Sequence, residues 1–174
     1  MYVYYESRAT ILRTTFTKNK AGASGGGVGF SNNRPSEVEP SIVEDCLFNQ
    51  NNASLSGGGM NVDSESITHI STTEFHNNYA SQSGGAVSGS NDAGITVTDS
   101  TMANNAAGDT GGSAYVTATS LAFNNVSVFD SVAGRTGGGV AMTGGTATGI
   151  FRSSTFGRCN ASAFGGALAA SSDV

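Results

Sequence analysis

The stretch that decides the fold is Phe75–Val87, FHNNYASQSGGAV, which sets an aromatic residue, an Asn-rich segment, an alanine and a glycine pair in that order. On its own, such a stretch would fit a phosphate-binding loop or a surface turn. The same order recurs along the 174-residue chain, with spacings of 32, 27, 27, 27 and 27 between the aligned apolar positions. These anchor positions are Phe16, Phe48, Phe75, Met102, Phe129 and Phe156. The stretch is therefore one copy of an internal repeat.

Two further columns follow each anchor. Three residues after it stand Asn19, Asn51, Asn78 and Asn105, and then Val132 and Cys159. Nine and ten residues after it stand Gly25, Gly26, Gly57, Gly58, Gly84, Gly85, Gly111, Gly112, Gly138, Gly139, Gly165 and Gly166. Glycine fills every position of this pair although it is only 25 of 174 residues, so the period is not accidental.

The units between glycine pairs have the character of strands. Gly, Ser, Thr and Asn fill them, and all four are poor residues for a helix interior. Segments such as 94–102, GITVTDSTM, alternate apolar or small residues with polar ones and are rich in β-branched side chains. The sequence therefore predicts an all-β fold, a parallel β-solenoid of about six 27-residue rungs that forms one domain over residues 1–174.

Each column then has an expected structural role. The anchor side chains point inward and stack from rung to rung. The Asn column lies at a bend where Asn tolerates the left-handed conformation, and its amides can hydrogen-bond between rungs. The glycine pair forms a corner that needs a positive φ or a close approach of two backbones.

The first spacing is longer than the others and predicts an insertion loop at residues 31–41, between rungs one and two. This segment contains both prolines, Pro35 and Pro40, which cannot donate to a strand ladder. A tolerated surface insertion and a binding loop are both open interpretations.

The paired motifs resemble the repeats of the chlamydial polymorphic outer membrane proteins. The Phe-x-x-Asn element is intact at 16–19, 48–51 and 75–78, and Gly-Gly-Ala followed by Val or Leu occurs at 84–87 and 165–168. The resemblance covers nearly the whole chain. It implies a right-handed parallel β-helix with a surface-exposed, adhesin-like role, and it transfers no catalytic residues.

Chemistry-bearing residues are present but dispersed. Asp45 and Asp99 share a column three residues before the anchor, about 10 Å apart over two rungs. Solvated outward carboxylates explain them best, whereas cleavage of a polysaccharide would need two carboxyls placed together. His69 and His76 have no accompanying metal ligands. The sequence therefore predicts no catalytic, cofactor or metal site.

Cysteines and sequons add no function. Cys46 and Cys159 lie four rungs apart, too far for a disulfide. The three sequons, at Asn52, Asn125 and Asn160, are about as many as chance gives in a chain this rich in Asn, Ser and Thr, so they do not establish glycosylation.

Charge and hydropathy exclude some partners. The net charge is −5, the pI is near 4.8 and the eight basic residues are scattered, which argues against nucleic acid. No apolar run is long enough for a transmembrane helix.

We therefore expect a non-enzymatic extracellular or cell-surface β-helix: a stalk, an adhesin segment or a fibre building block. The expected partners are of two kinds. Other rungs or subunits would cover the open ends, since solenoid ends are normally capped. A host-surface protein or glycan would bind elsewhere. We also expect the chain to be a segment of a longer solenoid. The alternative function is a polysaccharide-binding or polysaccharide-cleaving β-helix.

Overall fold

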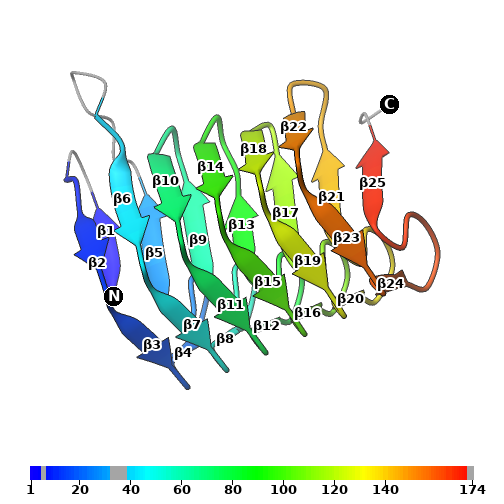
Figure 1. The fold of residues 1–174 in the computed structure, drawn as a ribbon, viewed down its shortest axis with the longest axis horizontal. Helices are drawn as coiled ribbons and strands as arrows, with labels where there is room; N and C mark the ends of the chain where they lie inside the picture. Colours follow the sequence, from blue (N-terminus) through cyan, green and yellow to red (C-terminus); the bar gives the residue numbers. More distant parts are fainter. Residues whose placement is uncertain (5–6, 32–38, 172–174) are drawn as a thin grey trace.

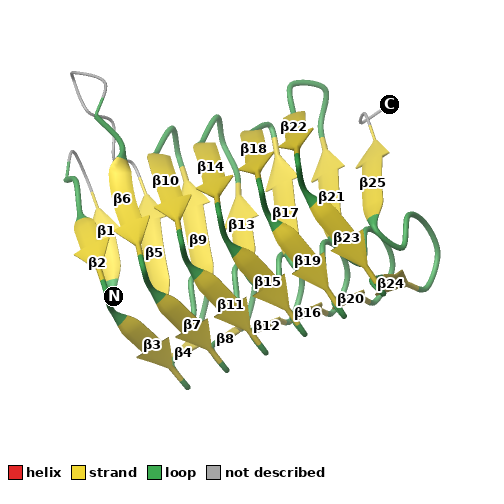
Figure 2. Cartoon of the chain, viewed as in Figure 1, coloured by secondary structure: helices red, strands yellow, loops and turns green. Residues whose placement is uncertain are grey.

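The computed structural model describes residues 1–4, 7–31 and 39–171, and within them every regular element is a β-strand (Figures 1 and 2). All strand pairs are parallel, and the strands form four sheets, which we name A, B, C and D in the order the chain visits them. One rung is one passage through A, B, C and D. Six rungs stack, followed by one more strand of sheet A, so the predicted β-solenoid is confirmed.

Sheets A and B hold the longer strands. Sheet A contains β1 (Tyr2–Tyr4), β5 (Val28–Ser31), β9 (Met60–Asp63), β13 (Val87–Gly89), β17 (Ala114–Thr117), β21 (Val140–Thr143) and β25 (Leu168–Ser171). Sheet B contains β2 (Thr10–Leu12), β6 (Ser41–Glu44), β10 (Ile67–Ser71), β14 (Gly94–Thr98), β18 (Ser120–Asn124) and β22 (Thr148–Arg152).

Sheets C and D are narrower. Sheet C contains β3 (Thr15–Thr17), β7 (Leu47–Asn49), β11 (Glu74–His76), β15 (Thr101–Ala103), β19 (Ser127–Phe129) and β23 (Thr155–Gly157). Sheet D contains β4 (Lys20–Ala21), β8 (Asn52–Ala53), β12 (Tyr79–Ala80), β16 (Ala106–Ala107), β20 (Val132–Ala133) and β24 (Asn160–Ala161).

The core is a set of inward columns that run along the rod. The rings of Phe16 and Phe48 lie 4.8 Å apart and those of Phe48 and Phe75 4.7 Å apart, with nearly parallel planes. Phe48, Phe75 and Met102 are completely buried. Their spacing follows from the distance between neighbouring strands, because one ring lies on each rung. The predicted anchor stack is therefore present through rung four.

Rung five differs from the prediction. Met102 pairs with Val128, and Val128 pairs with Phe156, so the spacings here are 26 and 28 residues. Phe129 was the predicted anchor, and that assignment is wrong. Its half-buried ring lies on the outer face of sheet C, where the guanidinium of Arg158 stands 5.8 Å from the ring centre.

The same one-residue shift affects the other rung-five columns. The corner glycines are Gly137 and Gly138, not Gly138 and Gly139, because Gly137 has the positive φ of 61° and its N–H donates to Phe164. Ser131, not Val132, occupies the Asn column, because Val132 pairs with Ala106 on sheet D.

The cause lies in the turn between sheets A and B, which we name the A–B turn. Between equivalent strand positions it covers Gly89 to Gly94 in rung four, Val116 to Ser120 in rung five and Met142 to Thr148 in rung six. Rung five is thus one residue shorter than rung four, and rung six is two residues longer than rung five. Because side chains alternate between faces, a change of one residue exchanges the inward and outward sets.

The predicted insertion also falls in an A–B turn, which lies within rung two and not between rungs one and two when a rung begins at sheet A. Its bounds, Ser31 and Ser41, lie at the end of β5 and the start of β6, and residues 32–38 are outside the described part of the chain. All the length differences among the rungs therefore arise at one edge of the solenoid.

Candidate functional site

The Asn column forms a ladder of amides at the corner between sheets C and D, buried at Asn51, Asn78 and Asn105 and exposed at Asn19. Asn78 shows the full pattern: its Nδ2 donates to Oδ1 of Asn105 at 3.1 Å and to the carbonyl oxygen of Phe48 at 2.9 Å. Its Oδ1 accepts from Nδ2 and from the backbone N–H of Asn51, both at 3.0 Å. Asn19 donates to Asn51 in the same way. The predicted inter-rung amide bonds are confirmed, and they satisfy polar groups that burial would otherwise penalise.

One detail of the prediction was wrong, because the ladder residues are not the left-handed ones. The positive φ belongs to the residue before each ladder position, and the side chains there point to solvent or lie half-buried. These residues are Lys18, Gln50, Asn77, Asn104, Asp130 and Arg158.

The two glycines of each pair have different tasks. Gly84 has a φ of 66°, a conformation that residues with a Cβ rarely adopt. A Cβ on Gly85 would collide with the backbone of Gly112 in the next rung. The prediction of a positive φ or a close backbone approach is confirmed, with the positive φ at Gly84 and the close approach at Gly85.

A second polar column lies two residues before the anchor and points inward. Its hydroxyls link rungs: Thr73 Oγ1 accepts from the backbone N–H of Cys46 at 3.3 Å and donates to the carbonyl of Ser71 at 2.8 Å. Ser100 repeats this arrangement one rung on. Recurring Ser and Thr at an inward position was the signal in the sequence.

The candidate catalytic carboxylates do not converge. Asp45 and Asp99 are exposed at left-handed positions of the corner between sheets B and C, and Thr72 stands between them. Asp99 accepts a hydrogen bond from the side chain of Asn125 at 2.7 Å. Their separation over two rungs, about 10 Å, is at the upper limit for a glycosidase pair.

The histidines and cysteines also lie apart. His69 is on the outer face of sheet B, and His76 is on sheet C, 3.0 Å from Glu74. Burial raises the pKa of the Cys46 and Cys159 thiols, so both disfavour the reactive thiolate. Within residues 1–4, 7–31 and 39–171, no group of three His, Cys, Asp or Glu side chains could hold a metal ion.

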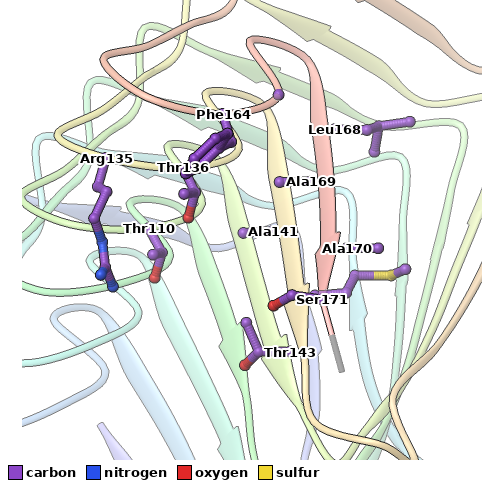
Figure 3. A pocket seen from close by; sticks show the side chains of 12 residues that line it. Thr110, Arg135, Thr136, Ala141, Thr143, Phe164, Leu168, Ala169, Ala170 and Ser171 are labelled. Carbon is purple, nitrogen blue, oxygen red and sulfur yellow. The ribbon is translucent and has the colours of Figure 1, made fainter. Parts of the chain in front are cut away.

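A hollow of about 570 Å³ lies along the corner between sheets D and A, beside strands β21 of rung six and β25, the last strand of sheet A (Figure 3). Thr110, Thr136 and Phe164 form one wall, and Ala141 and Ala169 lie on the sheet A side. Arg135 lies at its rim, where its guanidinium forms a bidentate pair with Asp109 of the previous rung. The described residues that line the hollow include no carboxylate or imidazole, so they offer hydroxyls and apolar surface but no proton-transfer pair.

A smaller hollow of about 270 Å³ lies beside sheet B at rungs one and two. Leu12, Arg13, Glu44 and Asp45 line it. It is open and carries charges of both signs, which suits hydration better than ligand capture.

The basic residues are less scattered than predicted. No Lys or Arg occurs between Arg34 and Arg135, while acidic residues continue through that interval. The described bases therefore lie in rungs one and six and at the corner that joins rungs five and six. On the outer face of sheet B, Glu44 in rung two and Arg152 in rung six occupy the same column.

Comparisons with known protein families, with curated proteins and with solved structures return no match to this chain. No helix in the described residues is long and apolar enough to cross a membrane.

Proposed function

We propose that the protein is a non-enzymatic β-helix of the cell surface or extracellular space, serving as a stalk, an adhesin-like segment or a fibre building block. The observation that supports this is the contrast between three regular corners and one variable edge. A repeat held constant on three sides behaves as a scaffold, and variable loops on a rigid scaffold are where recognition is usually found.

The A–B edge is the part of this scaffold that would meet a partner. Asn91, Asp92 and Thr146 are exposed there, in turns of different length. A host-surface protein or glycan is the proposed ligand, and the likeness to polymorphic outer membrane proteins, carried by the repeat motifs, favours the same role. Partners at the open ends stay a prediction.

The test is an adhesion assay with beads coated in the protein. We expect the beads to bind cells or immobilised glycoproteins, and a variant carrying Asp92→Asn and Thr146→Ala to bind less. A matched control carries Thr101→Ala and Ser127→Ala on sheet C, away from the A–B edge. Equal binding by both variants would remove the A–B edge from the proposal.

The alternative, a polysaccharide-cleaving β-helix, has one specific motive: the shared column of Asp45 and Asp99. Acidic and neutral polysaccharides are incubated with the wild type and with an Asp45→Asn, Asp99→Asn double variant, and new chain ends are measured. We expect none from either. Cleavage by the wild type that the double variant lacks would replace our proposal with the alternative.

A further inference from the structure

We infer that the outer face of sheet B associates with the same face of a second copy of the chain, around a two-fold axis. This inference concerns self-association and does not depend on the adhesive role proposed above. Strands β2, β6, β10, β14, β18 and β22 form one continuous row along the rod (Figure 1).

The face is exposed and mostly uncharged. Ile67 and Ile150 point outward and are 38% and 46% exposed. Thr96 and Ala122 lie between them. Gly94 has no side chain, so the middle of the face is recessed at this position. A sheet face with few charges and several exposed aliphatic side chains can pack against another sheet.

The symmetry of a face-to-face pair fixes which residues meet. A two-fold axis along strand β14 reverses the rod direction but keeps each column in place, so rung two faces rung six and rung three faces rung five. In such an isologous contact each residue pair occurs twice.

The two charged residues of this face then complement each other. Glu44 of rung two meets Arg152 of rung six in the other copy, twice, because both lie in one column. Neither side chain has an ion-pair partner in the described residues. Opposed charges across an interface fix orientation and register.

The shapes complement each other as well. His69 of rung three faces Ala122 of rung five, and Ile67 faces Ser120, so a large side chain meets a small one in both cases. Ile42 faces Ile150, which brings together the two isoleucines that flank the centre. Large and small residues alternating across facing positions allow two sheets to interdigitate.

One contact opposes the pairing. Asp99 lies at the edge of the face, close to the two-fold axis, and therefore near Asp99 of the other copy. Solvent and the hydrogen bond from the Asn125 amide reduce the repulsion between these two carboxylates. The flat projection of the face is small, about 16 by 25 Å from strand length and rung spacing. Interfaces of this size are weak, so we expect dissociation constants in the micromolar range or above.

The test measures association by analytical ultracentrifugation over a wide range of protein concentration. The full chain is expected to dimerise, and Glu44→Arg or Arg152→Glu alone is expected to weaken association at least about tenfold, because each places like charges opposite one another. An equimolar mixture of these two variants is expected to regain the wild-type affinity, since every facing pair in the mixed dimer is again opposite in charge. Asp99→Asn is expected to tighten the dimer.

The control is Glu74→Arg, an equal change of charge on the outer face of sheet C, which should leave association unchanged. Circular dichroism confirms that each variant is folded. The inference is overturned by a wild type that stays monomeric at all concentrations, by single variants that associate as the wild type does, or by a mixture that does not recover. Binding of a different molecule to this face of a monomer that does not dimerise would also overturn the inference.

Discussion

The corner between sheets C and D and the A–B turn belong to the same coil, yet only the A–B turn tolerates a change in the number of its residues. At the C–D corner every rung has the same length, and a ladder of amides, buried from Asn51 onward, joins Asn19 to Asn105. At the A–B turn the length changes between rungs, while the strands that follow keep their register. A polar group that must find a partner in the next rung fixes the length of the chain between them, and a solvated turn does not.

Insertion of one residue gives the largest contrast. An alanine inserted between Asn77 and Asn78 shifts the ladder and reverses the facing of every side chain after it, so we expect loss of most of the stability. An alanine inserted between Gly144 and Gly145 is expected to cost about 1 kcal/mol or less. Urea denaturation measures both. Similar midpoints for the two insertions would contradict the contrast.

Removal of one amide gives the next largest effect. Asn78→Ala removes the acceptor of the backbone N–H and of one side-chain N–H of Asn51, and one donor to the carbonyl of Phe48, and we expect a cost of about 3–5 kcal/mol. Thr146→Ala, in an exposed A–B turn, is expected to change the stability by less than about 0.5 kcal/mol. A cost below 1 kcal/mol for Asn78→Ala would show that the ladder is dispensable.

Two threonines of one rung sharpen the comparison further. Thr68 is fully buried where the chain enters sheet B, and its hydroxyl has no partner. Thr73 is equally buried, but its hydroxyl bonds to two backbone groups. Thr68→Val is therefore expected to stabilise the protein by about 1 kcal/mol, and Thr73→Val to destabilise it by about 1–3 kcal/mol. Thermal unfolding of the two variants measures this, and a shift in the same direction for both would refute it.

The smallest effect concerns the solvent side of the C–D corner. The hydrogen bonds from Arg158 lower the pKa of Asp130. The pair therefore contributes stability above the ordinary pKa of an aspartate, about 4, and this contribution is lost as the pH falls through the lowered value. Arg158→Gln should reduce that acid-side loss slightly without altering stability above pH 6 by much, because the pair is exposed. Melting temperatures across the acid range measure the difference, and an unchanged acid limb would contradict it.

The fold was predictable because the corners repeat. Glycine pairs and Asn positions recur at every rung up to the fourth, and no other architecture explains stacked columns of both. The register of rung five was mispredicted because Phe129 is the larger apolar residue beside Val128. The alternation of Leu121 and Phe123 before the corner, and of Val126 and Val128 after it, carries the correct phase.

The candidate interface was only partly open to sequence reasoning, because the register error of rung five puts Phe123 where Ala122 lies on the outer face. Glu44 and Arg152 stand four residues before the anchors Phe48 and Phe156, so the repeat already places them in one column, because the short turn of rung five and the long turn of rung six cancel. The outward direction of a side chain follows from its strand, whereas its neighbour across two or more rungs follows from the summed lengths of the turns between them.

The amide ladder has a consequence for how such a gene can change. In rungs two and three each ladder amide accepts a hydrogen bond from the previous rung and donates one to the next, so these units present the same hydrogen-bonding groups to their neighbours. Duplication or deletion of one whole coil joins identical surfaces, whereas a cut of any other length joins mismatched ones. The number of rungs, and with it the length of the rod, can therefore change during evolution by whole repeats.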